Sequence, residues 1–133
     1  MRTKISRVLR NIEGLYHELP FMCNGHKCRT PHGHSFWIEV IVEGDVDERG
    51  LCAGIDTGEI EDIWKPVHQM LDHAGSMNAI PGLENPTTEV FARWIWNRFN
   101  RVWCDNKRIH NFCVHVKEGY WSHCWVDGKP GEA

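Results

Sequence analysis

Residues 32–44 are the stretch of this 133-residue chain whose pattern leaves the fewest structural choices. Polar and apolar side chains alternate along it, which is typical of a β-strand with one face on a core and the other toward solvent. The stretch begins His-Gly-His, so His32 and His34 are two positions apart. Alternate residues of a strand leave the same face of a sheet. Two imidazoles held there by stiff backbone are suited to bind one metal ion such as zinc.

A zinc site needs at least one further ligand, because catalytic zinc sites have three protein ligands and one open position. His17 is the best third candidate, since it follows a predicted strand over residues 3–16 that can pair with 32–44. His26 and Cys28 lie closer in sequence and compete for the same role. A single histidine is usually a surface or core residue with no special function. His-Gly-His at a strand start, with a third histidine on a neighbouring strand, favours a metal site instead.

Length and composition predict one domain over residues 1–133, with a core large enough to fold without disulfides. The formal net charge is −3 and no basic tract is present, which argues against general nucleic-acid or membrane-surface binding. The first residues lack an apolar signal region, and no stretch reaches the roughly 18 apolar residues of a membrane span. We therefore expect a cytoplasmic protein whose six cysteines are thiols.

Two helices and two further strands complete the predicted order of elements. Residues 56–71 begin with a capping aspartate and carry an apolar stripe of helical spacing. A second helix with a similar stripe begins at Thr87 or Thr88. Apolar alternation returns over 109–117, and a last short strand covers 120–126. The order ββααββ predicts an α+β fold, with a four-stranded antiparallel sheet and two helices on one face.

Three other positions carry side chains suited to catalysis or binding. Cys28 lies in a loop beside basic residues and can be a base, a nucleophile, a fourth metal ligand or a structural thiol. Asp72 precedes His73, and a carboxylate beside an imidazole can orient it for proton transfer, although adjacent side chains often point apart. Glu118 follows an alternating strand and either binds N–H groups of a ligand or is simply solvated.

These residues together resemble the 6-pyruvoyl-tetrahydropterin synthase family, and most closely its bacterial branch, the 6-carboxy-5,6,7,8-tetrahydropterin synthases of the queuosine pathway. The matching segments agree in order and spacing from about residue 17 to residue 120. They are Gly25-His26-Lys27-Cys28, His32-Gly33-His34-Ser35-Phe36, Ile55-Asp56, Leu71-Asp72-His73, Pro81-Gly82-Leu83-Glu84-Asn85-Pro86-Thr87-Thr88-Glu89-Val90, Trp94-Ile95-Trp96 and Lys117-Glu118.

The resemblance implies a role for each candidate residue. The family's zinc ligands fall on His17, His32 and His34. Its catalytic residues fall on Cys28, Asp72 and His73, and the carboxylate that anchors the pterin ring falls on Glu118.

The resemblance also implies a fold, an assembly and a reaction. The fold is the tunnelling fold (T-fold), a four-stranded antiparallel sheet with two helices on one side. Family members form trimers that pair into hexamers, so that Cys28 and zinc come from one subunit and Asp72-His73 from its neighbour. The reaction is a zinc-dependent lyase step that converts 7,8-dihydroneopterin triphosphate to 6-carboxy-5,6,7,8-tetrahydropterin, acetaldehyde and triphosphate, in queuosine and 7-deazaguanine biosynthesis.

Two alternatives stay open. Within the same fold, the chain could be a 6-pyruvoyl-tetrahydropterin synthase or another enzyme of pterin side chains. From a different class, it could be a zinc-binding module without catalysis. The second alternative is motivated by two departures from the family's pattern, in the loop 74–78 and at Gly119.

Overall fold

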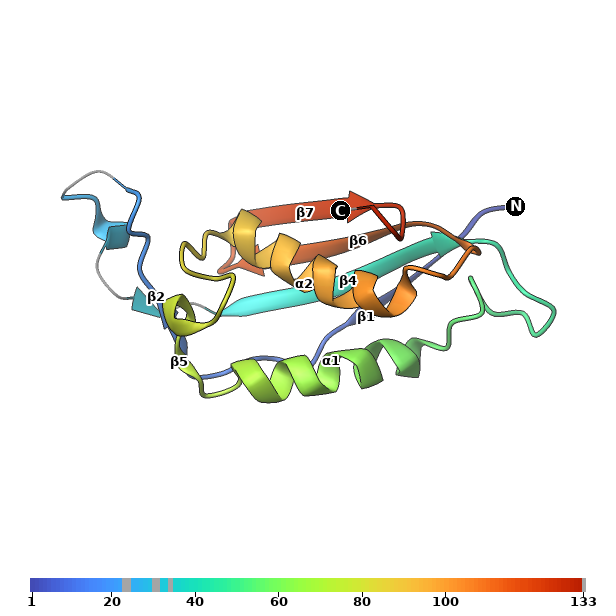
Figure 1. Cartoon of the computed structure of the whole chain (residues 1–133), viewed down its shortest axis with the longest axis horizontal. Helices are drawn as coiled ribbons and strands as arrows, with labels where there is room; N and C mark the ends of the chain where they lie inside the picture. Colours follow the sequence, from blue (N-terminus) through green and yellow to red (C-terminus); the bar gives the residue numbers. More distant parts are fainter. Residues whose placement is uncertain (23–24, 30–31, 34, 133) are drawn as a thin grey trace.

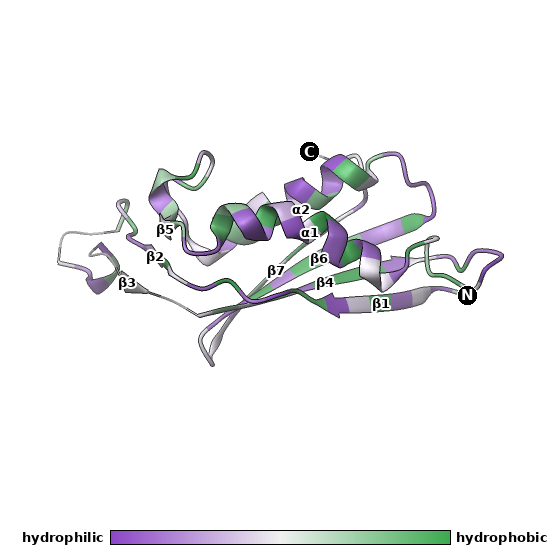
Figure 2. Cartoon of the chain, turned by 90° about the horizontal axis from the view of Figure 1, so that it is seen from below, coloured by the Kyte–Doolittle hydropathy of each residue, from purple (hydrophilic) through white to green (hydrophobic). Residues whose placement is uncertain are grey.

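The computed structural model describes residues 1–22, 25–29, 32–33 and 35–132. Its main sheet has four antiparallel strands in the order β1-β4-β6-β7. These strands are β1 (Thr3–Val8), β4 (Phe36–Gly44), β6 (Ile109–Glu118) and β7 (Ser122–Gly128). Helices α1 (Thr57–Leu71) and α2 (Thr88–Trp103) lie together on one face of this sheet (Figure 1 and Figure 2). The predicted α+β class and the ββααββ order of its main elements are therefore confirmed.

Local sequence explains where both helices begin. Asp56 caps α1 by accepting a hydrogen bond from the Gly58 N–H at 2.9 Å. Thr87 caps α2 by accepting from the Val90 N–H at 3.1 Å. The apolar stripes of both helices pack against the main sheet as one continuous core. Within the described residues, neither helix is long and apolar enough to cross a membrane.

The predicted strand over residues 3–16 is wrong in its second half, because β1 ends at Val8. Leu9, Ile12 and Leu15 are buried at intervals of three residues, which is not the two-residue period of a strand. Gly14 has a φ of 70°, a conformation that favours glycine and interrupts an extended chain.

A second, smaller sheet follows this interruption. Its strand order is β3-β2-β5, with β2 (Leu15–His17) in the centre. The partner β3 (His32–Gly33) is antiparallel to β2, and β5 (Gly75–Ser76) is parallel to it. The predicted continuous strand over 32–44 is therefore wrong, because its first residues pair with β2 whereas β4 pairs with β1 and β6.

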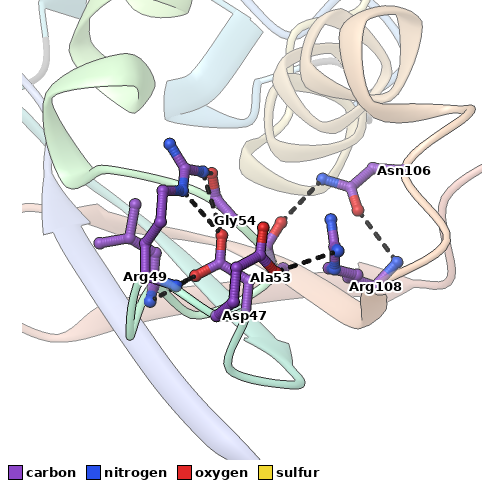
Figure 3. A network of polar contacts seen from close by, with 8 residues as sticks. Asp47, Arg49, Ala53, Gly54, Asn106 and Arg108 are labelled. Carbon is purple, nitrogen blue, oxygen red and sulfur yellow. Dashed lines mark hydrogen bonds and ion pairs between the residues drawn. The ribbon is translucent and has the colours of Figure 1, made fainter.

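A polar network closes the end of the main sheet that is remote from β2 (Figure 1 and Figure 3). Asp47 Oδ1 accepts from the N–H groups of Leu51 and Arg49 at 2.9 Å. These bonds, with the Leu51 N–H as the largest contribution, lower the pKa of Asp47 below its ordinary value. Asn106 donates to the Ala53 carbonyl at 3.1 Å and so ties the loop before α1 to the loop before β6. These contacts are structural, and the predicted site residue His17 lies on β2, at the opposite end of the fold.

Candidate functional site

His17 ends the central strand of the small sheet. Its side chain is almost completely buried, with 2% exposure, and its ring meets the Phe36 ring edge-on at 6.3 Å between centroids. In the antiparallel ladder, His17 lies directly opposite His32. The proposed pairing between the strand of His17 and the segment of His32 is therefore present, although it belongs to a separate sheet. His34, the third predicted ligand, lies outside the described residues.

The donors around β2 fit zinc by their chemistry, since imidazole nitrogen is one of its preferred ligands. Their register brings the backbones of His17 and His32 together from positions that are not adjacent in sequence. Among the residues that the structure describes, no three histidine, cysteine, aspartate or glutamate side chains gather closely enough to hold a metal ion. The set of three ligands thus stays a prediction, with two of its members on paired strands.

Cys28 lies in a short 3₁₀ turn, Lys27–Arg29, and its side chain is half-buried. Two hydrogen bonds hold its backbone. The Cys28 carbonyl accepts from the Leu19 N–H at 2.7 Å, two residues beyond His17. The Cys28 N–H donates to Nδ1 of His26 at 3.0 Å, which gives His26 a structural partner in this loop. The thiol is therefore attached to the segment that continues from β2.

Asp72 and His73 contact each other directly, although adjacent residues often point apart. Asp72 Oδ2 lies 3.1 Å from Nδ1 of His73, and Asp72 Oδ1 accepts the Glu13 N–H at 2.9 Å. The Glu13 N–H makes the largest contribution to a lowered pKa of Asp72, and the neighbouring His73 adds to it. The carboxylate form of Asp72 is thus favoured in the position where it can orient the imidazole.

In this pair His73 adopts a left-handed conformation, with a φ of 58°. Such a conformation is costly for a side chain other than glycine and needs support from its surroundings. The His73 N–H donates to the Glu13 carbonyl at 2.7 Å. A Cβ atom added to Gly14 would lie only 3.0 Å from the His73 Cα. His73 therefore packs against the segment before β2. This close contact is possible because residue 14 has no side chain.

Replacing Gly14 by alanine is expected to destabilise the protein by about 2–4 kcal/mol, as measured by urea unfolding. Part of the loss comes from placing alanine at positive φ, and the remainder from the close contact with His73. Gly25→Ala is the matched control, because Gly25 has a φ of 83° and nothing within 4 Å of the added atom. We expect the control to lose only about 1–2 kcal/mol. Equal losses in the two variants would show that the contact with His73 has no energetic consequence.

Glu118 is the last residue of the inner strand β6, at the end of the main sheet nearest the small sheet. It lies opposite Phe36 in the β4–β6 ladder, and Phe36 also contacts the His17 ring. The Thr88 hydroxyl, on the first turn of α2, donates to Oε2 of Glu118 at 2.5 Å. A carboxylate and a buried imidazole thus flank one phenylalanine at the same end of the fold.

A pocket of about 390 Å³ opens at this end of the main sheet. It is lined by three segments, namely residues 11–13, residues 35–37 and positions 117, 119 and 120. The first segment leads into β2, and the other two flank the predicted ligand His34 and Glu118 in sequence. Phe36 lines this pocket and also contacts the His17 ring, whereas Glu118 is not among the lining residues.

Sequence reasoning assigned no site role to Gly14 or Thr88. The partner of Thr88 is Glu118, which is 30 positions away, so no local pattern reveals their contact. Thr88 does lie in the Pro-Thr-Thr-Glu segment that starts α2, and a polar pair at a helix start was the available signal. Gly14 had no signal beyond being a glycine within the predicted strand 3–16.

The family model and the related sequences point to the same protein family. The family model described as 6-pyruvoyl tetrahydropterin synthase matches residues 8–129. A 6-carboxy-5,6,7,8-tetrahydropterin synthase of Synechocystis is 39% identical over 93 residues, which cover 65% of this chain and 67% of that protein. A dihydroneopterin monophosphate aldolase of Pyrococcus furiosus is 37% identical over 70 residues, which cover 53% of this chain and 56% of that protein. The matches thus span about half to two thirds of these relatives.

Solved structures agree on the fold. The 6-pyruvoyl tetrahydropterin synthase of Caenorhabditis elegans superposes with a TM-score of 0.78 at 17% identity, over 97% of both chains. The enzyme of the same name from Plasmodium falciparum gives a TM-score of 0.73 at 18% identity, over 96% of this chain and 98% of that chain. The architecture is therefore the T-fold that the sequence predicted.

Proposed function

The chain belongs to the 6-pyruvoyl tetrahydropterin synthase family, and we propose that it is the zinc-dependent lyase that makes 6-carboxy-5,6,7,8-tetrahydropterin. The substrate is 7,8-dihydroneopterin triphosphate, and acetaldehyde and triphosphate leave. The chain then acts as one catalytic domain in queuosine and 7-deazaguanine biosynthesis. The similarity to the Synechocystis synthase supports this choice within the family.

One observation carries the proposal, namely the ladder in which His17 lies opposite His32. It supports a metal site built from His17, His32 and His34 at the end of the sheet where Glu118 also lies. When bound, zinc supplies Lewis-acid polarisation of the substrate's side-chain hydroxyls, which makes neighbouring protons easier to remove. The protein's own groups then have to bind the pterin and move those protons.

Two acid–base groups are proposed for the proton transfers. Cys28 is one, and its half-buried position in a turn tied to the β2 segment supports this role. His73 is the other, oriented by the Asp72 carboxylate at 3.1 Å. General acid–base groups contribute ~10²–10⁴-fold each. Positioning and zinc therefore have to supply the remainder of the rate enhancement.

Glu118 is proposed to anchor the pterin by accepting two N–H groups at its edge. A carboxylate can form such a charge-assisted pair of hydrogen bonds. The Thr88 hydroxyl donates to Oε2 and so restricts the orientation of the carboxylate before the ligand arrives. A carboxylate has two oxygens that accept hydrogen bonds, which matches the two N–H donors at the edge of a pterin.

The deciding experiment is incubation of the zinc-loaded protein with 7,8-dihydroneopterin triphosphate, followed by assay of acetaldehyde and triphosphate. Release of both in equal amounts is expected. Triphosphate without acetaldehyde would instead indicate a 6-pyruvoyl-tetrahydropterin synthase. Preferential turnover of dihydroneopterin monophosphate would favour the activity named for the Pyrococcus relative. No turnover of any of these pterins, with zinc bound, would favour a zinc-binding module without catalysis.

The proposed enzyme is a homo-oligomer, a trimer or hexamer, with sites shared between subunits. In support, β1 and β7 are the outer strands of the main sheet, and their directions allow β7 of one copy to continue the antiparallel order with β1 of the next. In the shared site, Cys28 and the histidines come from one subunit and Asp72-His73 from the next.

Mixing two inactive variants tests the shared site. Cys28→Ala and His73→Ala subunits, unfolded together and refolded at equal ratio, are expected to recover about a quarter of wild-type activity, because random neighbours complete one site in four. Separately refolded variants, combined without exchange, are the control and should stay inactive. If each site used groups of a single chain, the refolded mixture would also stay inactive.

A further inference from the structure

On one side of β2, the backbone pairing ends before it reaches His17. On that side, β2 pairs in parallel with β5 through Leu15 with Gly75 and Tyr16 with Ser76. After Ser76, the chain leaves the sheet and forms a 3₁₀ turn, Met77–Ala79. The parallel ladder therefore ends before it reaches the residues at and beyond His17.

A side chain continues the pairing where the backbone stops. Oδ1 of Asn78 accepts the Glu18 N–H at 3.0 Å, and Nδ2 of Asn78 donates to the Glu18 carbonyl at 2.8 Å. Nδ2 donates a second time, to the Glu84 carbonyl at 3.1 Å. The carboxamide thus copies the donor and acceptor of a peptide group, because it offers one C=O and one N–H₂ in a single plane.

The orientation of this amide is determined by its three partners. Oδ1 faces an N–H donor, and Nδ2 faces two carbonyl acceptors. The opposite orientation would bring an oxygen against two oxygens and an N–H₂ against an N–H. The turn that presents Asn78 is itself anchored, since the neighbouring Met77 is fully buried.

We propose that Asn78 is a positioning residue for the zinc ligand His17. This inference rests on the proposed metal site. Asn78 acts through the backbone of Glu18, the residue directly after His17, and touches neither the metal nor the pterin. With the antiparallel ladder to His32 on the other side, it fixes the backbone of His17 on both flanks. A ligand held in place before the metal binds loses less freedom on binding, and the metal site gains affinity accordingly.

The proposal gives a role to part of the loop 74–78, which departs from the family's pattern. Gly75 and Ser76 supply the parallel strand, and Asn78 extends that strand by one more rung. The same loop follows Asp72 and His73 directly. It therefore connects the carboxylate–imidazole pair to the strand of the metal ligand within a single chain.

The test compares zinc retention in the full-length, zinc-loaded protein as a chelator of known affinity is added. Asn78→Asp is the main variant, because it keeps the size and one acceptor but replaces the donor to both carbonyls by an oxygen. Asn78→Ala removes all three hydrogen bonds. Direct hydrogen-bond partners of metal ligands typically contribute roughly 10–100-fold to metal affinity. Asn78 acts one residue away from the ligand, so we expect a loss near the lower end, about 10-fold, in both Asn78 variants.

Asn100→Asp is the matched control. Asn100 makes the same kind of clamp, because its Oδ1 accepts the Gly131 N–H at 2.8 Å and its Nδ2 donates to the Glu132 carbonyl at 3.0 Å. These contacts hold the C-terminal segment to α2, away from β2. We expect Asn100→Asp to keep the zinc affinity of the wild type. Cobalt substitution adds a second measurement, since the visible absorption of bound cobalt should change in Asn78→Asp and not in the control.

Each outcome decides between the proposals. Wild-type zinc affinity and an unchanged cobalt spectrum in the Asn78 variants would overturn the positioning role while leaving the proposed function intact. An equal loss of zinc in the Asn78 and Asn100 variants would also overturn it, because general destabilisation would then explain the effect. A wild-type protein that retains no zinc would refute the proposed function, and the positioning role with it.

Discussion

Replacing Cys28 by alanine is expected to lower kcat by ~10²–10⁴-fold, the usual contribution of one acid–base group, with zinc content unchanged. The thiol is half-buried in a turn whose backbone is tied to Leu19, so the variant should keep the local structure. Alanine removes the proton-transferring group and leaves the proposed histidine ligands in place. Acetaldehyde release and zinc content should be measured on the same preparation.

Cys104→Ala is the control for this prediction, because Cys104 is an exposed thiol at the end of α2. We expect it to keep wild-type activity. A Cys28→Ala protein that turns over normally would remove Cys28 from the proposed mechanism. Loss of zinc together with activity would make Cys28 a metal ligand instead, one of the alternatives that its position in the sequence leaves open.

Replacing His17 by alanine is expected to lower zinc affinity by about 10²–10⁴-fold, if the roughly 10–16 kcal/mol of a zinc site is shared among three protein ligands. Activity at limiting zinc should fall in parallel. The side chain is 2% exposed and ends the central strand of the small sheet, so its removal eliminates a donor that water cannot easily replace. Chelator competition gives the affinity, and turnover at graded zinc concentrations gives the functional effect.

His115→Ala controls for the loss of a buried imidazole. His115 is 9% exposed, and it contacts Glu39 and His123 on β4 and β7. We expect the control to lose stability and to retain zinc. If His17→Ala also retained zinc at wild-type affinity, the predicted ligand set would be incorrect, and the competing candidates His26 and Cys28 would have to be tested.

Strong local periodicity made much of the fold predictable. The strand 109–117 is observed as Ile109–Glu118. The first helix begins at its predicted cap Asp56, and the second at Thr87, one of the two caps predicted for it. The stretches 3–16 and 32–44 were predicted as single strands, and both are interrupted. In the first stretch the chain passes from the main sheet to the small sheet after Gly14, and in the second it passes from the small sheet into the main sheet. Both changes involve partners far away in sequence. Periodicity carries no information about such partners.

The candidate site, like the fold, could be predicted only in part from the sequence. Residue type and spacing singled out His17, Cys28 and Glu118, because their chemistry is visible in the sequence. The contacts that orient these side chains could not be predicted from the sequence. The contact between Asp72 and His73 depends on a left-handed backbone at His73, and the contact of Glu118 with Thr88 joins two elements of the finished fold. Supporting contacts of this kind are a property of tertiary structure.

The small sheet has a consequence for the order of folding. Its central strand joins partners from distant parts of the chain, and Glu18 and Asn78 are 60 positions apart. Closing so long a loop is entropically costly until α1 has packed in between. We therefore expect the strand that carries His17 to reach its final form after the helix layer is in place. If the proposed zinc site is correct, metal capture follows that step, and a chain that stalls before it would be recognisable by its failure to hold zinc.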